Sequence, residues 1–417
     1  MFLTDEEERM LAGEQGLGVR KAMQTLVKLG NAFDAEKMVK LSSAHILPMQ
    51  PLDWLMEMKE GDTKVRTLTT LHAYFLDPQR WNEMGIAEKY GERQIPDYYN
   101  RLDIYTKMGV IPIMTCVPYL TGIVPRMGSF FEWSGSSGQC LANSALGARG
   151  ARVGDNIVMA GAITGRVPYI GLLKPENRYG RLLVEVSNDL DLENFTYADY
   201  GAIAYHVGAI AEERNVVFSG LPNSMSFEDC KYLYSPLPVS GAVTLCHIVG
   251  VTPEAPTLEA AFGNKKPEER IVVGESEMKE AYDKLNTATT DDVDFVTFGC
   301  PHCTINEIRE IASLLNGKRK SENVELWVAT AAPIRLAAER AGYVDIIEKA
   351  GGLVIQDCCV GAGAPFIFCG IHPKTMATNS ARAAHYLPRT SAGRSNIVYG
   401  STEDCIDDAI TGKWRAR

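Results

Sequence analysis

In the last third of the chain, short apolar runs typical of strands alternate regularly with apolar residues at the spacing of a helix. Residues 294–298 form a short apolar run typical of a buried strand, and residues 304–315 repeat apolar side chains at the helical spacing. The pattern then predicts a strand over 324–329, a helix over 333–341 and a strand over 352–355. Strands that alternate with helices indicate an α/β domain built on a parallel sheet.

The first two thirds of the chain show the same two periods less regularly. Thr4 and Glu7 have the spacing of a capping box and predict the start of a helix. The pattern also predicts a short helix over 35–41 and strand-like structure over 156–186. Residues 121–150 are rich in Gly, Ser and Asn, so they either bring backbone N–H groups to a polar ligand or form a flexible surface loop.

The length predicts more than one domain, because 417 residues exceed what one ordinary core organises. We expect an N-terminal helical and α/β segment over 1–70, one or more α/β domains over 71–290 and a C-terminal α/β domain over 291–417. Hydrophobic residues make up 46% and charged residues 23% of the chain, which is typical of a globular protein.

The charge and the absence of long apolar runs narrow the possible partners. A net charge of −10 argues against nucleic acid and anionic membranes as partners. The N-terminal residues lack the basic and apolar regions of a signal peptide, and no run of about 18 apolar residues predicts a membrane span. We therefore expect a cytoplasmic protein with neither a membrane nor a nucleic-acid partner.

Cysteines follow three of the expected strands. Cys116 comes after the apolar run 110–114, and Cys300 comes after the run 294–298. Cys358 and Cys359 come after the strand predicted over 352–355. Because the carboxyl ends of parallel strands meet at one edge of a sheet, these cysteines could converge on one iron–sulfur cluster. A structural zinc site and a thioredoxin-type couple are weaker alternatives, since the spacing of the cysteines fits neither pattern well.

Short motifs along essentially the whole chain carry a family resemblance. They are Ser43-Ala44-His45, Thr69-Thr70, Cys116-Val117-Pro118-Tyr119, Ala142-Asn143-Ser144-Ala145-Leu146-Gly147-Ala148-Arg149, Pro175-Glu176-Asn177-Arg178, Gly250-Val251-Thr252-Pro253-Glu254-Ala255, Gly299-Cys300-Pro301-His302, Asp357-Cys358-Cys359, Asn379-Ser380 and Ala384-His385-Tyr386. In these motifs the chain resembles the large subunit of aconitase X, the dehydratase branch of the aconitase superfamily. The resemblance implies about three α/β domains around a central iron or iron–sulfur site, without the swivelling small domain.

The resemblance also implies a ligand set and a cofactor. Cys116, Cys300 and Cys359 match the family's metal ligands, with Cys358 in the intervening position of its Asp-x-Cys pattern. Members of the family hold a [4Fe–4S] cluster, a [2Fe–2S] cluster or mononuclear iron, and three cysteines fit all of them. The candidate substrate or supporting residues are His45, Thr70, Ser136, Ser137, Asn143, Ser144, Arg149, His302 and Arg382. Arg178 is a further candidate for binding a carboxylate or phosphate, with a surface salt bridge as its alternative role.

The implied activity is removal of water from a small hydroxy acid. Two substrates go with the family, cis-3-hydroxy-L-proline and mevalonate 5-phosphate, and the lack of a recognisable phosphate loop favours the first. The superfamily base resembles a serine on the swivelling domain, so we expect a separate small subunit to supply it and to form a heterodimer.

Two features leave the function open. Gly135 and Gly138 stand where the family usually has a glutamate and an alanine, which bears on the substrate. A non-catalytic iron–sulfur relative and a structural zinc protein are the alternatives to an enzyme.

Overall fold

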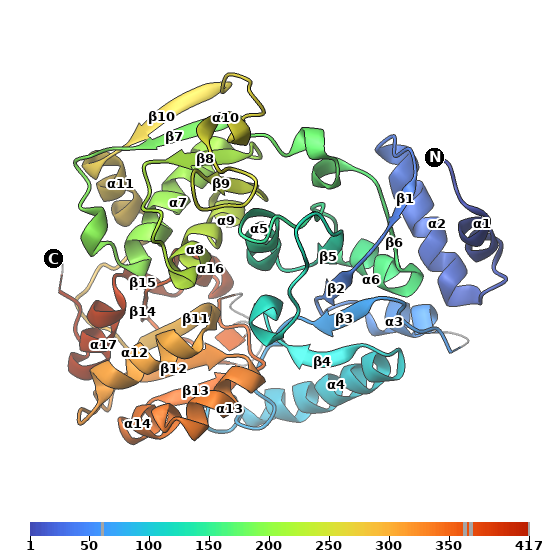
Figure 1. Ribbon diagram of the computed structural model, residues 1–417. Helices are drawn as coiled ribbons and strands as arrows, with labels where there is room; N and C mark the ends of the chain where they lie inside the picture. Colours follow the sequence, from blue (N-terminus) through green and yellow to red (C-terminus); the bar gives the residue numbers. More distant parts are fainter. Residues whose placement is uncertain (60–61, 362–364, 367–369, 416–417) are drawn as a thin grey trace.

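Three parallel β-sheets with helices packed on them, together with one pair of short antiparallel strands, make up the described part of the protein (Figure 1). The computed structural model describes residues 1–59, 62–361, 365–366 and 370–415. Each sheet is formed by one continuous part of the chain, so the molecule has three successive α/β units. The fold therefore has the α/β class that the alternating pattern predicts.

The first sheet has the strand order β4-β3-β2-β5, and all its strands are parallel. Its strands are β2 (Ser43–Ile46), β3 (Leu68–Leu71), β4 (Ile111–Met114) and β5 (Phe131–Trp133). Its helices are α1 (Asp5–Ala12), α2 (Leu17–Ala32), α3 (Leu52–Lys59), α4 (Glu88–Lys107), α5 (Ser136–Ser144) and α6 (Asp155–Thr164), with the 3₁₀ turn η1 (Pro118–Thr121). The boundary expected at residue 70 falls inside β3, and it needs correction because one sheet joins strands from both sides of it.

The second sheet has the order β10-β7-β8-β9 and is also parallel. Its strands are β7 (Leu182–Val186), β8 (Val216–Ser219), β9 (Cys246–Ile248) and β10 (Glu269–Val273). Its helices are α7 (Tyr197–Ala211), α8 (Phe227–Tyr234), α9 (Leu237–Ser240), α10 (Leu258–Ala261) and α11 (Glu275–Leu285). The 3₁₀ turns η2 (Gly171–Leu173), η3 (Pro175–Asn177) and η4 (Leu192–Asn194) lie before β7 and before α7.

The third sheet has the order β13-β12-β11-β14-β15. Its strands are β11 (Phe295–Cys303), β12 (Glu325–Thr330), β13 (Leu353–Gln356), β14 (Thr375–Thr378) and β15 (Asn396–Tyr399). Its helices are α12 (Ile305–Leu315), α13 (Ala332–Arg340), α14 (Tyr343–Lys349), α16 (Ala381–Thr390) and α17 (Thr402–Thr411). The strand–helix order predicted from residue 294 to residue 355 is confirmed, because amphipathic helices here cover a fully buried sheet.

One prediction from the hydrophobic pattern is wrong, and a second is only partly confirmed, since β7 lies within 156–186 but a helix comes first. Residues 35–41 contain the strand β1 (Met38–Lys40), which pairs antiparallel with β6 (Arg166–Pro168), rather than a helix. The stretch 156–186, expected to be strand-like, begins with most of α6. Residues 158–164 of this helix are all buried. A helix buried on every side needs no polar face, so its sequence looks like that of a buried strand.

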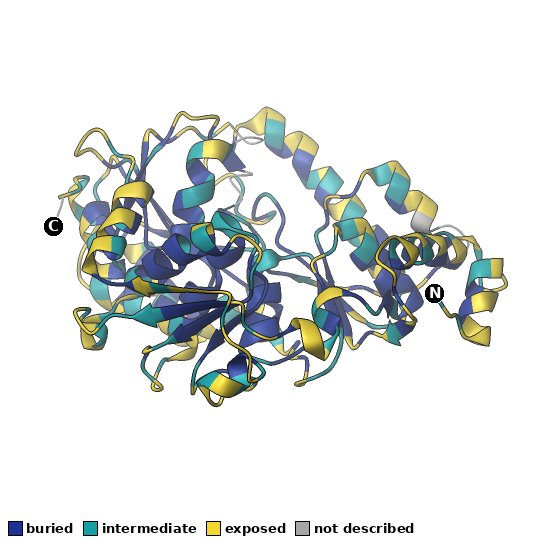
Figure 2. Ribbon diagram, turned by 90° about the horizontal axis from the view of Figure 1, so that it is seen from above, coloured by how far each residue is buried: buried dark blue, intermediate teal, exposed yellow. Residues whose placement is uncertain are grey.

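One hydrophobic core crosses all three sheets. Trp133 of β5, Phe218 of β8 and Trp327 of β12 belong to the same cluster of buried side chains. Figure 2 shows the buried strands enclosed by helices whose outer faces are exposed. Within the described ranges, no helix combines the length and the apolar character needed to cross a bilayer. The continuous core holds the sheet edges that carry the cysteines in fixed relative positions.

Candidate metal and substrate site

The three predicted ligand cysteines lie where strands of two sheets end. Cys116 follows β4 of the first sheet, and Cys359 follows β13 of the third. Cys300 lies within β11, in a part where the pairing with β12 shifts register between Phe298 and Cys303. The strand therefore runs further than the sequence suggested, and its irregular end carries the thiol.

The three thiols are close enough to influence one another's protonation. Burial raises the pKa of Cys300 to about 12, with Arg382 acting against the rise and Cys359 adding to it. Burial also raises the pKa of Cys116, and Cys359 and Cys300 raise it further. Among the described residues, however, no three His, Cys, Asp or Glu side chains are gathered in a way that would hold a single metal ion.

The backbone comes unusually close to the Cys300 thiol at Gly361. A Cβ atom built on Gly361 would lie 1.9 Å from Cys300 Sγ, so any side chain at this position would displace the thiol. Cys358, in contrast, points its Sγ toward the carbonyl oxygen of Phe75 at 3.3 Å and is fully buried. Of the two adjacent cysteines, Cys359 is therefore the one that interacts with Cys116 and Cys300.

His302 connects the three cysteine-bearing segments. Its backbone N–H donates to Cys116 Sγ at 3.2 Å, and its Nε2 donates to the carbonyl oxygen of Cys358 at 2.8 Å. Because a carbonyl oxygen can only accept, neutral His302 carries its proton on Nε2, and Nδ1 accepts from Thr115 Oγ1 at 3.1 Å. Both ring nitrogens are thus used to hold the segments together.

His45 and Thr70 support the Cys116 segment from behind. His45 Nε2 donates to the carbonyl oxygen of Thr115 at 2.8 Å, and its Nδ1 accepts from Thr70 Oγ1 at 2.8 Å. Both nitrogens of His45 are engaged, so this residue positions the loop before Cys116 rather than offering a free group to a substrate.

Arg382 is the cation of the site. Ser380 caps α16, where its Oγ accepts from the Ala383 N–H at 3.1 Å and also donates to the carbonyl oxygen of Cys300. This contact holds the first turn of α16, with Arg382, beside the thiol. Burial lowers the pKa of Arg382, but Tyr386 and the thiols of Cys300, Cys359 and Cys116 together raise it more.

Arg382 has only neutral hydrogen-bond partners. Its Nη1 donates to Ser136 Oγ at 3.2 Å and to the carbonyl oxygen of Ser235 at 3.4 Å. Within the part of the chain that the structure describes, Arg382 forms no ion pair with a carboxylate, whereas Arg178 and five partly buried arginines do. Ser136 begins α5, and Ser137 beside it is buried. The stretch 121–150 thus contains a buried helix rather than a surface loop.

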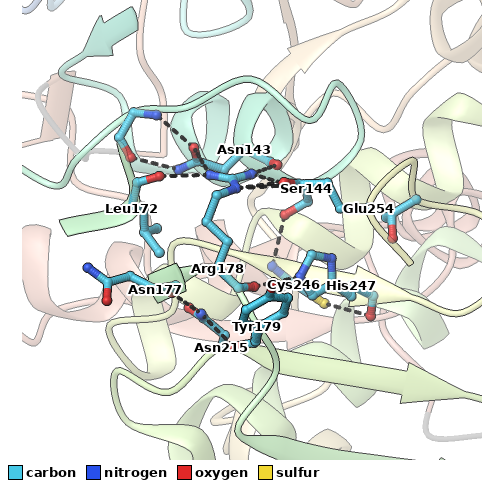
Figure 3. A network of polar contacts seen from close by, with 12 residues as sticks. Asn143, Ser144, Leu172, Asn177, Arg178, Tyr179, Asn215, Cys246, His247 and Glu254 are labelled. Atoms are coloured by element: carbon cyan, nitrogen blue, oxygen red, sulfur yellow. Dashed lines mark hydrogen bonds and ion pairs between the residues drawn. The ribbon is translucent and has the colours of Figure 1, made fainter. Parts of the chain in front are cut away.

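Other predicted site residues belong to a network that joins the first and second sheets (Figure 3). Arg178 donates through Nε to both carboxylate oxygens of Glu254, at 2.9 and 3.0 Å, and through Nη2 to the carbonyl oxygen of Asn143 at 2.8 Å. The Asn143 side chain bonds the backbone of Gly150 and Thr244, and Ser144 Oγ accepts from the Cys246 N–H at 2.9 Å.

These contacts change the roles expected for three residues. We reassign Asn143, Ser144 and Arg178 from substrate binding to the junction between the sheets, because their polar groups are occupied there. The salt bridge considered for Arg178 is formed with Glu254, but it is not on the surface, since the Arg178 side chain is only 3% exposed. Arg149 lies on the same segment, and its buried Nε has no hydrogen-bond partner among the described residues.

The sequence patterns did not single out two features beside the cysteines. Lys231 of α8 and Glu307 of α12 form an ion pair whose side chains are 0% and 3% exposed, and it joins the second and third sheets. Glu307 also closes the capping box of α12 with Thr304, which the sequence spacing could have revealed. His72 directly follows β3, and its position after a strand was the available signal.

Comparison with known proteins places the chain in a family. Three family models match in succession: Aconitase X first domain over residues 1–176, Aconitase X second domain over 180–283 and Aconitase X third domain over 293–411. The crystal structure of the holo form of Thermococcus kodakaraensis aconitase X is similar at 31% identity and a TM-score of 0.85, covering 98% of this chain and 100% of that one.

Curated relatives carry two different names. The phosphomevalonate dehydratase large subunit of Methanocaldococcus jannaschii is 38% identical, with 97% of this chain and 99% of that protein covered. The same subunit of Methanothermobacter thermautotrophicus is 39% identical, with 93% and 94% covered. The cis-3-hydroxy-L-proline dehydratase of Pseudomonas aeruginosa is 30% identical, with 98% of this chain and 70% of that protein covered.

The fold and the similarities define an α/β enzyme of the hydro-lyase class, because the matching relatives are named as dehydratases. More particularly, the chain belongs to the aconitase X family.

Proposed function

We propose that this chain is the large subunit of an iron-dependent dehydratase that removes water from a small anionic hydroxy acid. The observation that carries the proposal is the convergence of Cys116, Cys300 and Cys359 around Arg382, a cation without a carboxylate partner among the described residues. Cys116 and Cys300 are buried and Cys359 is partly exposed. A buried thiol is costly to ionise, so a site with two of them favours a metal that displaces their protons.

The donor set fits a cluster better than a single ion. One iron would need its sulfur ligands around a single point at roughly zinc-like distances of about 2.3 Å, and the described residues do not gather in that way. Three thiols that influence one another's pKa without surrounding a single point suit an iron–sulfur cluster. Such a cluster with one iron open to substrate would supply a Lewis acid for the leaving hydroxyl.

The chain's own residues would hold and orient the substrate. Arg382 and Ser136 face the cysteines from two different sheets, and a guanidinium group binds carboxylate or phosphate well. Ser136 and Ser137 also lie in the first turn of α5, where free backbone N–H groups favour an anion. His302, His45 and Thr70 keep the cysteine segments in place during turnover.

Of the two candidate substrates, we favour mevalonate 5-phosphate. The absence of a phosphate loop in the sequence favoured cis-3-hydroxy-L-proline, but phosphomevalonate dehydratase subunits include relatives at 38% and 39% identity, against 30% and 32% for the hydroxyproline enzymes. An arginine with no carboxylate partner replaces the need for a phosphate loop. The hydroxyproline activity stays the second candidate, because those relatives also match nearly the whole chain.

The proton-abstracting base belongs, in this proposal, to a partner. We assign it to a serine of a separate small subunit, which the name "large subunit" of the relatives supports. The compartment would be the cytoplasm, where a reducing environment keeps the cysteines available to iron.

Anaerobic co-expression with the candidate small subunit tests the proposal. Iron and sulfide are quantified, and dehydration of mevalonate 5-phosphate and cis-3-hydroxy-L-proline is measured side by side. Bound iron with turnover of the phosphorylated acid is the expected result. Zinc in place of iron, or iron with turnover of neither acid, would overturn it.

A further inference from the structure

His72 lies at the edge of the sheets that carries Cys116, Cys300 and Cys359, called here the cysteine edge. The site described above gives its imidazole ring no role. It directly follows β3, which lies between β4 and β2 in the first sheet. Cys116 follows β4 in the same way, so both side chains belong to the carboxyl edge of neighbouring parallel strands. His72 is 8% exposed, and its ring lies 5.7 Å from that of His45.

The hydrogen bonds of His72 differ from those of the other two histidines at this edge. His45 and His302 each use both ring nitrogens within the protein. His72 uses only Nδ1, which donates to the carbonyl oxygen of Ala73 at 3.2 Å. Among the described residues no group bonds its Nε2. Since the carbonyl oxygen can only accept, the proton of a neutral ring lies on Nδ1, and Nε2 is a free acceptor.

Burial keeps this acceptor neutral. Burial lowers the pKa of His72 to about 4, the Ala73 carbonyl opposes the shift, and Arg382 lowers the pKa further. His72 in turn lowers the pKa of His302, which places the ring near the segment that carries Cys300. At neutral pH the group therefore presents a lone pair, not a positive charge, to the space around Arg382.

Gly135 leaves the space that His72 occupies. A Cβ atom built on Gly135 would lie 3.1 Å from His72 Cδ2 and 3.4 Å from His72 Nε2. A methyl group there would press on the ring from the side that carries Nε2, and glycine avoids that contact. The orientation of His72 thus depends on the absence of a side chain at position 135.

We propose that His72 is a specificity-determining residue whose Nε2 accepts a hydrogen bond from the hydroxyl group of the bound hydroxy acid, in a position that Gly135 keeps open. The proposal rests on the proposed function for the class of substrate. An acceptor beside a cation sorts substrates by two features at once: the anionic group goes to Arg382 and the hydrogen-bond donor to His72. A site that hydrogen-bonds a substrate hydroxyl rejects the analogue without it.

The test compares hydroxylated and deoxygenated ligands on matched variants. Binding of cis-3-hydroxy-L-proline against L-proline, and of mevalonate 5-phosphate against its 3-deoxy analogue, is measured by calorimetry on the iron-loaded complex. Wild type should prefer the hydroxylated member of the pair that it binds. His72→Leu should weaken that member about tenfold and leave its deoxy analogue unchanged, because only the hydroxyl loses its acceptor. His72→Gln, whose amide oxygen can replace Nε2, should recover most of the loss.

Two further variants separate this role from a structural one. Gly135→Ala should reproduce part of the His72→Leu loss with the iron content unchanged. His206→Leu changes a histidine on α7 that faces Glu280 instead, and it should alter neither ligand. Equal weakening of both ligands in His72→Leu, or loss of iron in that variant, would overturn the proposal.

The same experiment distinguishes failure of the proposed function from failure of the role of His72. If wild type dehydrates neither acid, the proposed function fails, while the binding comparison still judges His72. If wild type binds hydroxylated and deoxygenated ligands equally, the role of His72 is wrong whatever the turnover.

Discussion

Two buried arginines of this protein have opposite surroundings. Arg178, between the first and second sheets, faces the carboxylate of Glu254 and donates through all three guanidinium nitrogens to protein acceptors. Arg382, on the third unit, bonds among the described residues only a hydroxyl group of the first unit and a carbonyl group of the second. The charge of Arg178 is neutralised by Glu254, whereas no carboxylate among the described residues pairs with Arg382.

The histidines around the two arginines differ in the same way. His247 in the Arg178 network donates to the carbonyl oxygen of Arg178 at 2.8 Å and stiffens the junction. At the edge of the sheets that carries the cysteines, His45 and His302 are equally fixed, but no group in the described part of the chain bonds His72 Nε2. A polar network with its charge balanced internally stabilises a fold, and one that is left incomplete on one side is suited to a ligand.

The largest effect on activity is expected from a substitution in the network around Arg382 and the cysteines. Cys300→Ser should abolish iron binding and lower dehydration by about a thousandfold or more, because the leaving hydroxyl loses its Lewis acid. Iron content and turnover are measured on the co-expressed complex. Cys303→Ala, three positions along the same strand, should keep its iron. Equal loss in both variants would mean that the region needs cysteine for packing only.

A substitution in the network of Arg178 and Glu254 should lower the stability of the fold and leave iron binding unchanged. Arg178→Met leaves the Glu254 carboxylate without its buried partner and should lower the free energy of unfolding by about 3–5 kcal/mol, with iron retained. Urea unfolding measures the change. Arg181→Met is the matched control, since Arg181 and Glu268 are 47% and 53% exposed and should contribute less than about 1 kcal/mol. If the two variants unfold alike, the Arg178 network does not stabilise the junction.

The smallest effect is a pH dependence centred on the cysteine edge. An unfolded histidine binds a proton near pH 6.5, but folded His72 does so only near pH 4. Between these values the unfolded chain holds more protons, so the free energy of unfolding falls as the pH is lowered. His72 alone should account for about 2 kcal/mol between pH 7 and pH 5.

Urea unfolding at both pH values checks this expectation. The variant His72→Gln should lose less stability than wild type on acidification, by about the amount assigned to His72. If the free energy of unfolding falls equally in wild type and His72→Gln between pH 7 and pH 5, the buried ring is not the group that titrates.

Much of the architecture was accessible from sequence, because it rests on contacts between near neighbours. The capping boxes of α1 and α12 depend on residues three positions apart, and both are formed. The alternation of strand and helix from residue 294 to residue 355 follows from the two periods of the apolar pattern. Where a helix is buried on all sides, as α6 is, the period disappears and the prediction fails.

The candidate site was accessible only in part. Cysteine after a strand is a local pattern, and it holds for Cys116 and Cys359, whereas Cys300 lies inside the longer strand β11. Which polar side chains remain free at those edges is decided by partners far away in the chain: Arg178 meets Glu254 across 76 positions, and Arg382 meets Ser136 across 246. The sequence by itself therefore determined the α/β elements and the cysteine positions. Only the tertiary structure decided that Asn143, Ser144 and Arg178 close a junction while Arg382 and His72 stay available, because hydrogen bonding and charge balance depend on neighbours that folding brings together.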